Sequence, residues 1–348
     1  MNLSLNTTMN SMMSNLTLDV ANFRKSYLAF YLLTIPLSFM GIIGNVVLII
    51  TVFKRKQFHT PSYILSANMA VSDVIVLVFG SIFLIINIVL SLNPDFIQSS
   101  YRTVCQVNYF VLNFSYTTSS QSFMAISIDR YRIMTSVNGK SPFQKKKTLM
   151  IIVGITWLIG LTFAIPMLQI SNINPRLPLM CDFQPYGTHL NGMLSIYHVA
   201  SLLIAFIIPL LTVSILYFKI IRHISQTIST VRSNPGNNYD DSKKRQIRAT
   251  KMMILATLLF MLNSLPIMAV WVVSVLIGKS YAELVLTYGQ FLFIVISSAF
   301  FLASLTAIQN PFIFITYNKS LRAAMISNFR FEGKTKMTTI AIGTNFKA

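Results

Sequence analysis

Long apolar runs alternate along this sequence with short segments rich in lysine, arginine, asparagine and proline. An apolar run of about 20 residues is long enough to cross the ~30 Å hydrocarbon core of a bilayer as an α-helix. None of the runs shows the alternation of a β-barrel strand, and a helix satisfies its backbone hydrogen bonds within its own segment. The pattern predicts seven transmembrane helices, over roughly 27–53, 62–91, 103–134, 148–170, 194–221, 248–277 and 285–317.

Composition agrees with this pattern. The chain is 54% hydrophobic and only 11% charged, and its mean hydropathy is +0.63. A soluble domain usually has about a quarter of its residues charged, because those side chains cover its surface. We therefore expect an all-α membrane protein, a seven-transmembrane helix bundle whose solvent is lipid.

The distribution of basic residues predicts the orientation of the bundle. Only five of the 28 lysines and arginines lie on the side of the N-terminus, at Arg24, Lys25, Arg102, Arg176 and Lys279. Cytoplasmic loops retain positive charge, so we expect an extracellular N-terminus and a cytoplasmic C-terminus, in the plasma membrane. The net charge of +19 is divided among short inner loops, which does not indicate a nucleic-acid surface.

The outer segments have polar, irregular compositions. Residues 1–26 are expected to form an extracellular, unstructured and glycosylated N-terminus, because they hold three N-x-[ST] sequons, at Asn2, Asn6 and Asn15. The second outer loop, 171–193, carries three prolines and is expected to be irregular or a hairpin.

The inner segments differ from one another. The third inner loop, 223–246, has the composition of a flexible linker. After the seven-transmembrane region (27–317), residues 318–331 place apolar side chains at every fourth position between basic ones, which predicts an amphipathic helix on the inner leaflet. A continuation of the last span is the alternative. Residues 332–348 are expected to form a cytoplasmic tail.

The chain has two cysteines, Cys105 at the outer start of the third predicted helix and Cys181 in the second outer loop. Both lie on the oxidising side of the membrane, where a disulfide is favoured. Two free thiols are the alternative. A disulfide would hold the loop over the bundle as a lid or wall.

Two carboxylates lie in or beside the membrane, where a charged side chain is energetically unfavourable, so each is expected to have a function. Asp73 is deep in the second span, where a charge costs about 2.5–3.5 kcal/mol and should face partners inside the bundle. Asn45, Ser119 and Asn310 are its expected companions. Such a polar pocket could hold water or a sodium ion, or could be a purely structural hydrogen-bond cluster. Catalytic and multivalent metal motifs are missing from the sequence, and a transporter or channel would need more buried charge.

The second carboxylate, Asp129, is followed directly by Arg130 at the inner end of the third helix, within "SIDRYRI". The carboxylate can hold the guanidinium at the cytoplasmic mouth until a partner inserts. A D-R-Y triplet alone is weak, but its place at the end of the third of seven helices, 25 residues after the outer cysteine, makes it specific.

One landmark in every helix, in order, resembles the rhodopsin-like class of G protein-coupled receptors, and the resemblance covers residues 30–330. These landmarks are Gly44-Asn45, Asp73, Cys105, Asp129-Arg130-Tyr131, Trp157, Pro209 with Tyr217, Pro266 and Asn310-Pro311. The resemblance implies an agonist from outside and a heterotrimeric G protein inside, with arrestin and receptor kinases as further partners. It assigns activation and coupling to Asp129, Arg130, Tyr131, Tyr217, Asn310, Pro311 and Phe314.

The sequence departs from this family at several activation positions. Ser264 stands where the sixth helix usually has a tryptophan, and Phe314 replaces the tyrosine that ends the NPxxY motif. Phe260 is retained, but its usual aliphatic neighbour on the third helix is Ser120. We expect the shared outward movement of the sixth helix, started by altered contacts.

Among these receptors the chain most resembles the opsins, through "HTPSYILSANMAVSD" and "NKSLR". Opsins attach retinal through a lysine six residues before the NP asparagine, and that position here is Ser304. The counterion position, three residues after Cys105, is Asn108. The chain is similar to the lysine-less opsin-like receptors called placopsins, so we expect no covalently bound cofactor.

The resemblance also outlines a ligand pocket. Its expected residues are Asn108, Leu112, Tyr116, Ser264, Met268, Trp271 and Ser304. Amine receptors have an aspartate where this chain has Leu112, so a biogenic amine is not expected. A neutral or lipid-like molecule and a non-covalent retinoid are the favoured diffusible ligands, and a peptide docking on Asp182, Glu283 and the outer loops is the rival.

Overall fold

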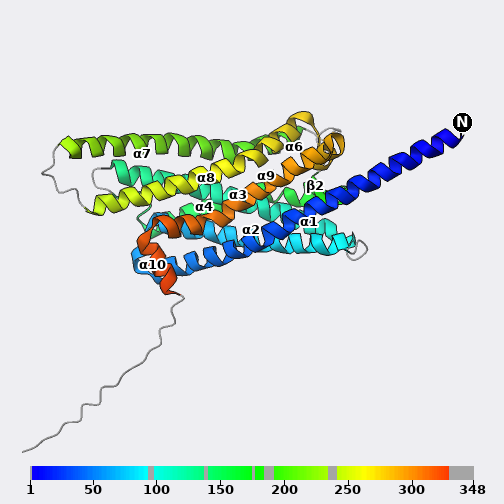
Figure 1. Ribbon diagram of the computed structural model, residues 1–348. Coiled ribbons are helices and arrows are strands. Elements are labelled where there is room, and N and C mark those ends of the chain that lie inside the picture. The colour runs from blue at the N-terminus through cyan, green and yellow to red at the C-terminus, as the bar shows by residue number, and fades with distance from the viewer. Residues whose placement is uncertain are drawn as a thin grey trace, which may run out of the picture.

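The computed structural model describes residues 2–92, 98–136, 140–174, 177–183, 192–233 and 241–328. Their side chains are described from Leu28 onward except at 177–180, 183, 192–193, 195, 227–233 and 241–245. Its helices lie side by side in one elongated bundle (Figure 1). The elements are α1 (Asn2–Lys54), η1 (Lys56–Phe58), α2 (Pro61–Leu92), α3 (Gln98–Thr135), α4 (Lys146–Ala164), α5 (Met167–Ile170), β1 (Ser171–Asn174), β2 (Leu177–Phe183), α6 (Gly192–Leu202), the π-helical η2 (Leu203–Ile207), α7 (Ile208–Ser233), α8 (Asp241–Ile277), α9 (Tyr281–Tyr317) and α10 (Lys319–Ser327).

The described residues confirm the predicted seven-helix architecture, with α6, η2 and α7 forming the fifth crossing. Six of the seven crossings are long and apolar enough to span a membrane by themselves. The exception is α3, whose middle turns carry a run of polar side chains from Thr117 to Ser122, all buried. These hydroxyl and amide groups face protein, so α3 lies at the centre of the bundle.

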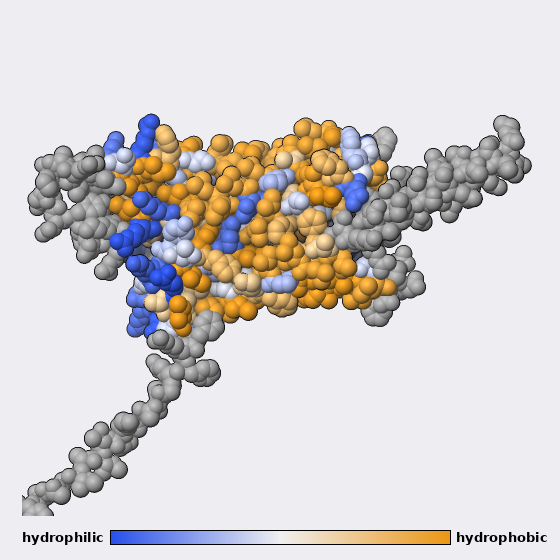
Figure 2. Space-filling model, viewed as in Figure 1, coloured by the Kyte–Doolittle hydropathy of each residue, from blue (hydrophilic) through white to orange (hydrophobic). Residues whose placement is uncertain are grey.

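The outer surface of the bundle is apolar. A broad hydrophobic band covers the middle of the molecule, and hydrophilic residues gather at the end that carries α10 (Figure 2). Large apolar side chains such as Leu158, 65% exposed, and Phe291, 76% exposed, point outward. This arrangement suits a lipid environment, in which exposed apolar side chains carry no hydrophobic cost.

The helices extend further than the apolar runs. The expectation of an unstructured N-terminus is wrong, because α1 begins at Asn2. No glycine or proline precedes Pro36, so nothing in the sequence breaks the helix. Glycosylation of the three sequons stays a prediction, because their side chains lie outside the described ones.

The third inner loop is also shorter than expected. Of the predicted linker 223–246, α7 takes the part up to Ser233 and α8 begins at Asp241. Charged helical side chains can extend past the membrane into water, so the ends of an apolar run do not mark the ends of a helix.

Two other expected segments are confirmed. The second outer loop forms an antiparallel hairpin of β1 and β2, in which Ser171 pairs with Phe183 and the register shifts between Ile173 and Asn174. At the other end, α10 is separate from α9 because Asn318 adopts an extended backbone and its side chain accepts a hydrogen bond from Leu321 N at 3.0 Å. Residues 329–331 of the predicted surface helix lie outside the described part of the chain.

The outer part of α9 turns at Gly289, whose φ of 74° and ψ of −161° belong to a region that only glycine adopts easily. A Cβ added there would meet no other atom within 4 Å. The turn therefore depends on backbone freedom and not on lack of space.

A Gly289→Ala variant should lose about 1–3 kcal/mol of stability, because alanine is strained in this conformation. The matched control is Gly154→Ala in α4, where the added Cβ also meets open space in an ordinary helix. Thermal unfolding of the purified protein measures both. Equal melting temperatures for the two variants would show that the turn at Gly289 is not a strained position.

Candidate ligand cavity and inner polar network

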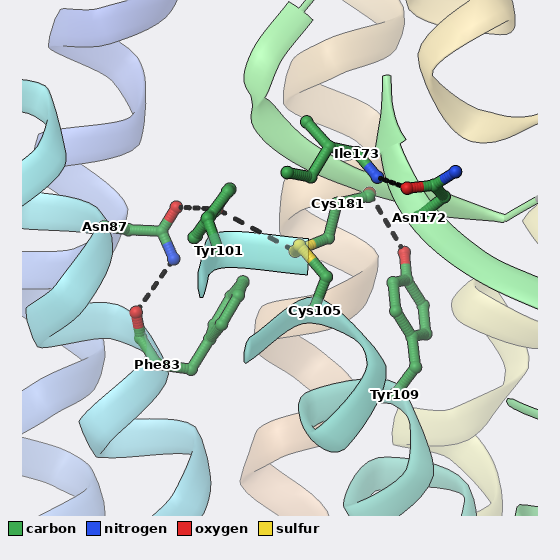
Figure 3. The surroundings of a disulfide bond; sticks show 8 residues. All are labelled: Phe83, Asn87, Tyr101, Cys105, Tyr109, Asn172, Ile173 and Cys181. Atoms are coloured by element: carbon green, nitrogen blue, oxygen red, sulfur yellow. Dashed lines mark hydrogen bonds between the residues drawn. A yellow bond between two sulfur atoms is a disulfide. The ribbon is translucent and has the colours of Figure 1, made fainter. Parts of the chain in front are cut away.

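The outer end of the bundle is closed by the hairpin. Cys105 of α3 and Cys181 of β2 form the predicted disulfide (Figure 3). The hydroxyl of Tyr109 donates to the backbone oxygen of Cys181 at 3.3 Å, and that of Tyr101 donates to Asn87 Oδ1 at 2.6 Å. The disulfide, the Tyr109 hydrogen bond and a 3.8 Å contact between the Tyr101 hydroxyl and Cys181 Sγ therefore fix β2 against the outer end of α3.

Beneath the hairpin lies a cavity of about 320 Å³. Its walls come mostly from α1, α2, α3, α8 and α9 and are largely apolar. Six of the seven predicted pocket residues line it: Asn108, Leu112, Tyr116, Met268, Trp271 and Ser304. Ser264 is not among the lining residues; it is fully buried and its hydroxyl donates to Phe260 O, one turn earlier, at 2.7 Å, so its part in ligand binding stays a prediction.

Charge is scarce around this cavity. Among the described residues that line it, Asp73 is the one carboxylate and none is a lysine or arginine. The hydroxyl of Ser304 donates to the backbone oxygen of Phe300 at 3.0 Å, and α9 contains no lysine along its length. The cavity wall at Ser304 therefore offers a hydroxyl and no primary amine.

Asp73 closes the inner end of the cavity and joins three helices. It is 2% exposed; Oδ1 accepts from Ser119 Oγ at 3.1 Å and Oδ2 accepts from Asn310 Nδ2 at 2.8 Å. Asn45, the fourth predicted member, does not bond to Asp73. Its amide donates to Ala307 O of α9 at 2.9 Å and so ties α1 to α9.

The same cluster holds buried acceptors. The Oδ1 atoms of Asn45 and Asn310 are buried and have no hydrogen-bond partner among the described residues. The described residues contain no group of three or more histidine, cysteine or acidic side chains, so a multivalent metal cluster does not fit. Uncharged oxygens around a single carboxylate fit a monovalent cation or water.

A ring cluster connects the cavity to the core beneath it. Phe260 of α8 lines the cavity and packs on Tyr116 with ring centres 5.3 Å apart, and on Phe123 at 4.9 Å. The sequence directed attention to Ser120 as the neighbour of Phe260. The apolar contact comes from Phe123, one turn further along α3. The sequence did not single it out, because the chain has 26 phenylalanines.

At the inner end, Asp129 and Arg130 are both buried, with Arg130 Nη2 3.9 Å from Asp129 Oδ2. The carboxylate also accepts hydrogen bonds from the hydroxyls of Ser62 on α2 and Ser141 in the second inner loop. The Nε atom of Arg130 has no partner in the described part of the chain. Asp129 is therefore held on two sides, whereas the guanidinium is weakly held.

Tyr217 on α7 lies buried with its hydroxyl 3.0 Å from Thr257 Oγ1 on α8. This bond links the fifth and sixth crossings. Phe314 is fully buried and, as a phenylalanine, cannot hydrogen-bond to Tyr217. Sequence reasoning missed Thr257, because a threonine in a transmembrane helix carries no signal of its partner. Tyr131 is half-buried beneath Lys219 Nζ, which is 5.9 Å from its ring centre.

The break at Asn310-Pro311 lies against α1. A Cβ on Gly44 would come within 2.8 Å of the Pro311 ring, so the glycine allows α1 and α9 to approach closely. Asn310 uses its amide both toward Asp73 and toward Thr306 O at 3.1 Å. The landmark residues of α1, α2 and α9 thus form one contact region.

Comparison with known proteins agrees with this geometry. The family model "7 transmembrane receptor (rhodopsin family)" matches residues 44–314. Neuropeptide Y receptor type 2 of Bos taurus is 24% identical over 320 residues, covering 89% of this chain and 77% of that protein. The neuromedin-K receptor of Rattus norvegicus is 23% identical over 295 residues, covering 84% of this chain and 61% of that receptor.

The crystal structure of squid rhodopsin has the same fold, with a TM-score of 0.69 at 19% identity, covering 88% of this chain and 86% of that one. The match to the family model extends over most of the chain and includes the helices that carry Asp73, Arg130 and Asn310. It favours a receptor over the transporter or channel that was the alternative. The chain belongs to the rhodopsin family of seven-transmembrane receptors.

Proposed function

We propose that this receptor binds an uncharged or lipid-like ligand non-covalently in the cavity beneath the hairpin and responds by activating a heterotrimeric G protein. The observation that carries the proposal is the cavity itself: about 320 Å³, largely apolar, with no lysine or arginine among its described lining. Ligand pockets in proteins commonly have this size and character. A retinoid held without a covalent bond falls within this class.

The contacts suggest how binding reaches the inner face. A ligand that presses on Tyr116 changes the packing of Phe260, which shares a ring contact with Phe123. Phe260 lies on α8, and Pro266 weakens that helix because it donates no backbone hydrogen bond. Movement of α8 would stretch the Tyr217–Thr257 bond and uncover Arg130 for a partner.

The peptide alternative has support in the names of the two relatives above. The carboxylates expected to dock a peptide, however, are engaged within the receptor. Asp182 is 4% exposed and accepts a hydrogen bond from Ser280 Oγ at 2.6 Å, and Glu283 Oε2 accepts from Ser280 N at 2.9 Å. A peptide would need other groups for its recognition.

We extend the proposal to a sodium ion at Asp73. The ion would balance a buried carboxylate that the described residues leave without a basic partner, with Ser119 and the free amide oxygen of Asn310 as further oxygen donors. It would supply positive charge beside α2, α3 and α9 and so hold them together.

Arg130→Ala should lower receptor-stimulated nucleotide exchange by about tenfold or more, because it removes a charge-assisted contact with the G protein. The matched control is Arg132→Ala, an exposed arginine on the same helix, which should keep its activity. Exchange is measured on membranes with equal surface receptor. An Arg130→Ala receptor as active as the control would contradict the coupling role.

Leu112→Trp should weaken the response to a cavity ligand by about tenfold, because a larger ring in the cavity overpacks it. Leu158→Trp, on the lipid-facing surface, is the control. Light, retinoids, lipids and peptides are screened on cells that express each variant. A response only to peptides, equal in both variants, would refute the cavity proposal, and a retinoid that stays attached to the protein after denaturation would refute non-covalent binding.

Sodium chloride should raise the melting temperature of the purified receptor above its value in choline chloride at equal ionic strength. Asp73→Asn should abolish that difference, because the amide cannot balance a cation, whereas Asp129→Asn should retain it. A sodium effect of the same size in Asp73→Asn would place the ion elsewhere.

A further inference from the structure

Three groups share the carboxylate of Asp129 at the inner mouth of the bundle. The hydroxyl of Ser141 donates to Oδ1, and the hydroxyl of Ser62 donates to Oδ2. The Arg130 guanidinium approaches the same Oδ2, with its Nη2 at 3.9 Å. Ser141 Oγ therefore lies beside the carboxylate that holds the guanidinium, and a bulky anionic group attached to this oxygen would reach Arg130.

The two serines have different surroundings. Ser62 is fully buried in the first turn of α2, whereas Ser141 is half-buried in the segment that leads into α4, outside any helix or strand. Ser141 Oγ also accepts a hydrogen bond from Phe143 N at 3.0 Å, which closes a tight turn around the exposed Pro142. Of the two hydroxyls, only that of Ser141 lies on a loop, at the end of the bundle predicted to face the cytoplasm.

The residues after Ser141 suit a proline-directed serine/threonine kinase. Such enzymes select a serine that is followed by proline, and basic residues a few positions later favour many of them. Pro142 follows the serine directly, and Lys145 to Lys147 come next, all exposed. Phe143 is 9% exposed and packs into the core, so the loop has to detach at this residue before an enzyme can hold it in an extended form.

We propose that Ser141 is a phosphorylation site whose phosphate captures Arg130 and so prevents coupling to the G protein. A kinase transfers the γ-phosphoryl group of ATP to Ser141 Oγ. The bond between this phosphorus and ADP breaks, ADP leaves, and the hydroxyl proton passes to the kinase. The inference rests on the coupling role proposed above for Arg130, and it gives the second inner loop a direct effect on that residue.

The phosphate would rearrange the contacts of Asp129. The esterified oxygen of Ser141 can no longer donate a hydrogen bond, and the phosphate charge of about −1.5 to −2 repels the carboxylate. The guanidinium of Arg130 has a long contact to Asp129 and a buried Nε without a partner in the described part of the chain. A phosphate can accept two parallel hydrogen bonds from a guanidinium, so it competes well against that contact. Arg130 would then be paired inside the receptor.

The modification itself is tested on the full-length receptor. Purified receptor is incubated with ATP and a proline-directed kinase, receptor from expressing cells is prepared in parallel, and mass spectrometry of peptides locates the phosphate. We expect phosphate on Ser141. Its absence from this residue in both preparations overturns the proposal.

The effect on coupling is tested with two variants of the same size. Ser141→Glu introduces a negative charge, and Ser141→Gln does not. Binding of nucleotide-free G protein heterotrimers needs no ligand, and it should be about tenfold or more weaker for Ser141→Glu, the effect of one charge-assisted hydrogen bond. Ser136→Glu, at an exposed serine between α3 and α4, should bind like the unaltered receptor. Equal binding by the two Ser141 variants, or an equal loss in Ser136→Glu, overturns the capture of Arg130.

Melting temperatures test the contact without a G protein. Relative to Ser141→Gln, Ser141→Glu should melt at a higher temperature when Arg130 is present than when Arg130→Gln is added to both, because the introduced carboxylate then loses its partner. The same difference with and without Arg130→Gln would show that the charge at position 141 does not contact this arginine. This result stands even if Arg130→Ala proves fully active, so failure of the capture and failure of the coupling role are distinguishable.

Discussion

Inside a bilayer no water is available for a polar group, so each buried donor or acceptor has to find its partner on another helix or in its own backbone. This constraint bears most heavily on Asp73, because a charge at that depth costs about 2.5–3.5 kcal/mol. Its bonds to Ser119 and Asn310 bring α2, α3 and α9 together at one level. Asn45 joins α1 to this group, because its amide donates a hydrogen bond to a backbone oxygen of α9. The positions of four crossings therefore follow from a few amide, hydroxyl and carboxyl groups.

The same constraint explains why α3 is at the centre. A helix with so many hydroxyls is poorly suited to face lipid, and its polar side chains reach neighbouring crossings on several sides. Gln121 Nε2, for example, donates to Ile204 O at 2.7 Å, inside the π-helical turn η2. A π turn leaves carbonyl groups without their usual helical partner, and the glutamine satisfies one of them. The cavity and the inner mouth are both built against this helix.

Sequence patterns predicted the fold well because an apolar run of membrane length has few alternatives. They also located Asp73, Arg130 and the disulfide, since charges and cysteines are rare in this chain. They did not predict the partners that decide how these groups are held. Ser62 and Ser141 bond to Asp129, and Thr257 bonds to Tyr217, across separations of up to 67 residues.

Hydroxyl side chains occur throughout the sequence and have no periodicity that marks a partner, so only their spatial arrangement distinguishes them. Ser264 illustrates this: its place in the family pattern suggested the cavity, whereas the structure shows its hydroxyl donating to Phe260 O of its own helix. Asp182 and Glu283 were named as docking groups only for the rival peptide ligand. Both bond to Ser280 at the outer start of α9, which no pattern of charge along the chain reveals.

Signalling requires the cavity and the inner mouth to face opposite sides of the membrane. The chain must therefore cross the membrane an odd number of times, with its basic loops inside. Epitope tags at the two ends of the chain test it directly. The N-terminal tag should bind antibody on intact cells, and the C-terminal tag only after permeabilisation. Both tags accessible from the same side would contradict the seven-crossing bundle and the signalling role that rests on it.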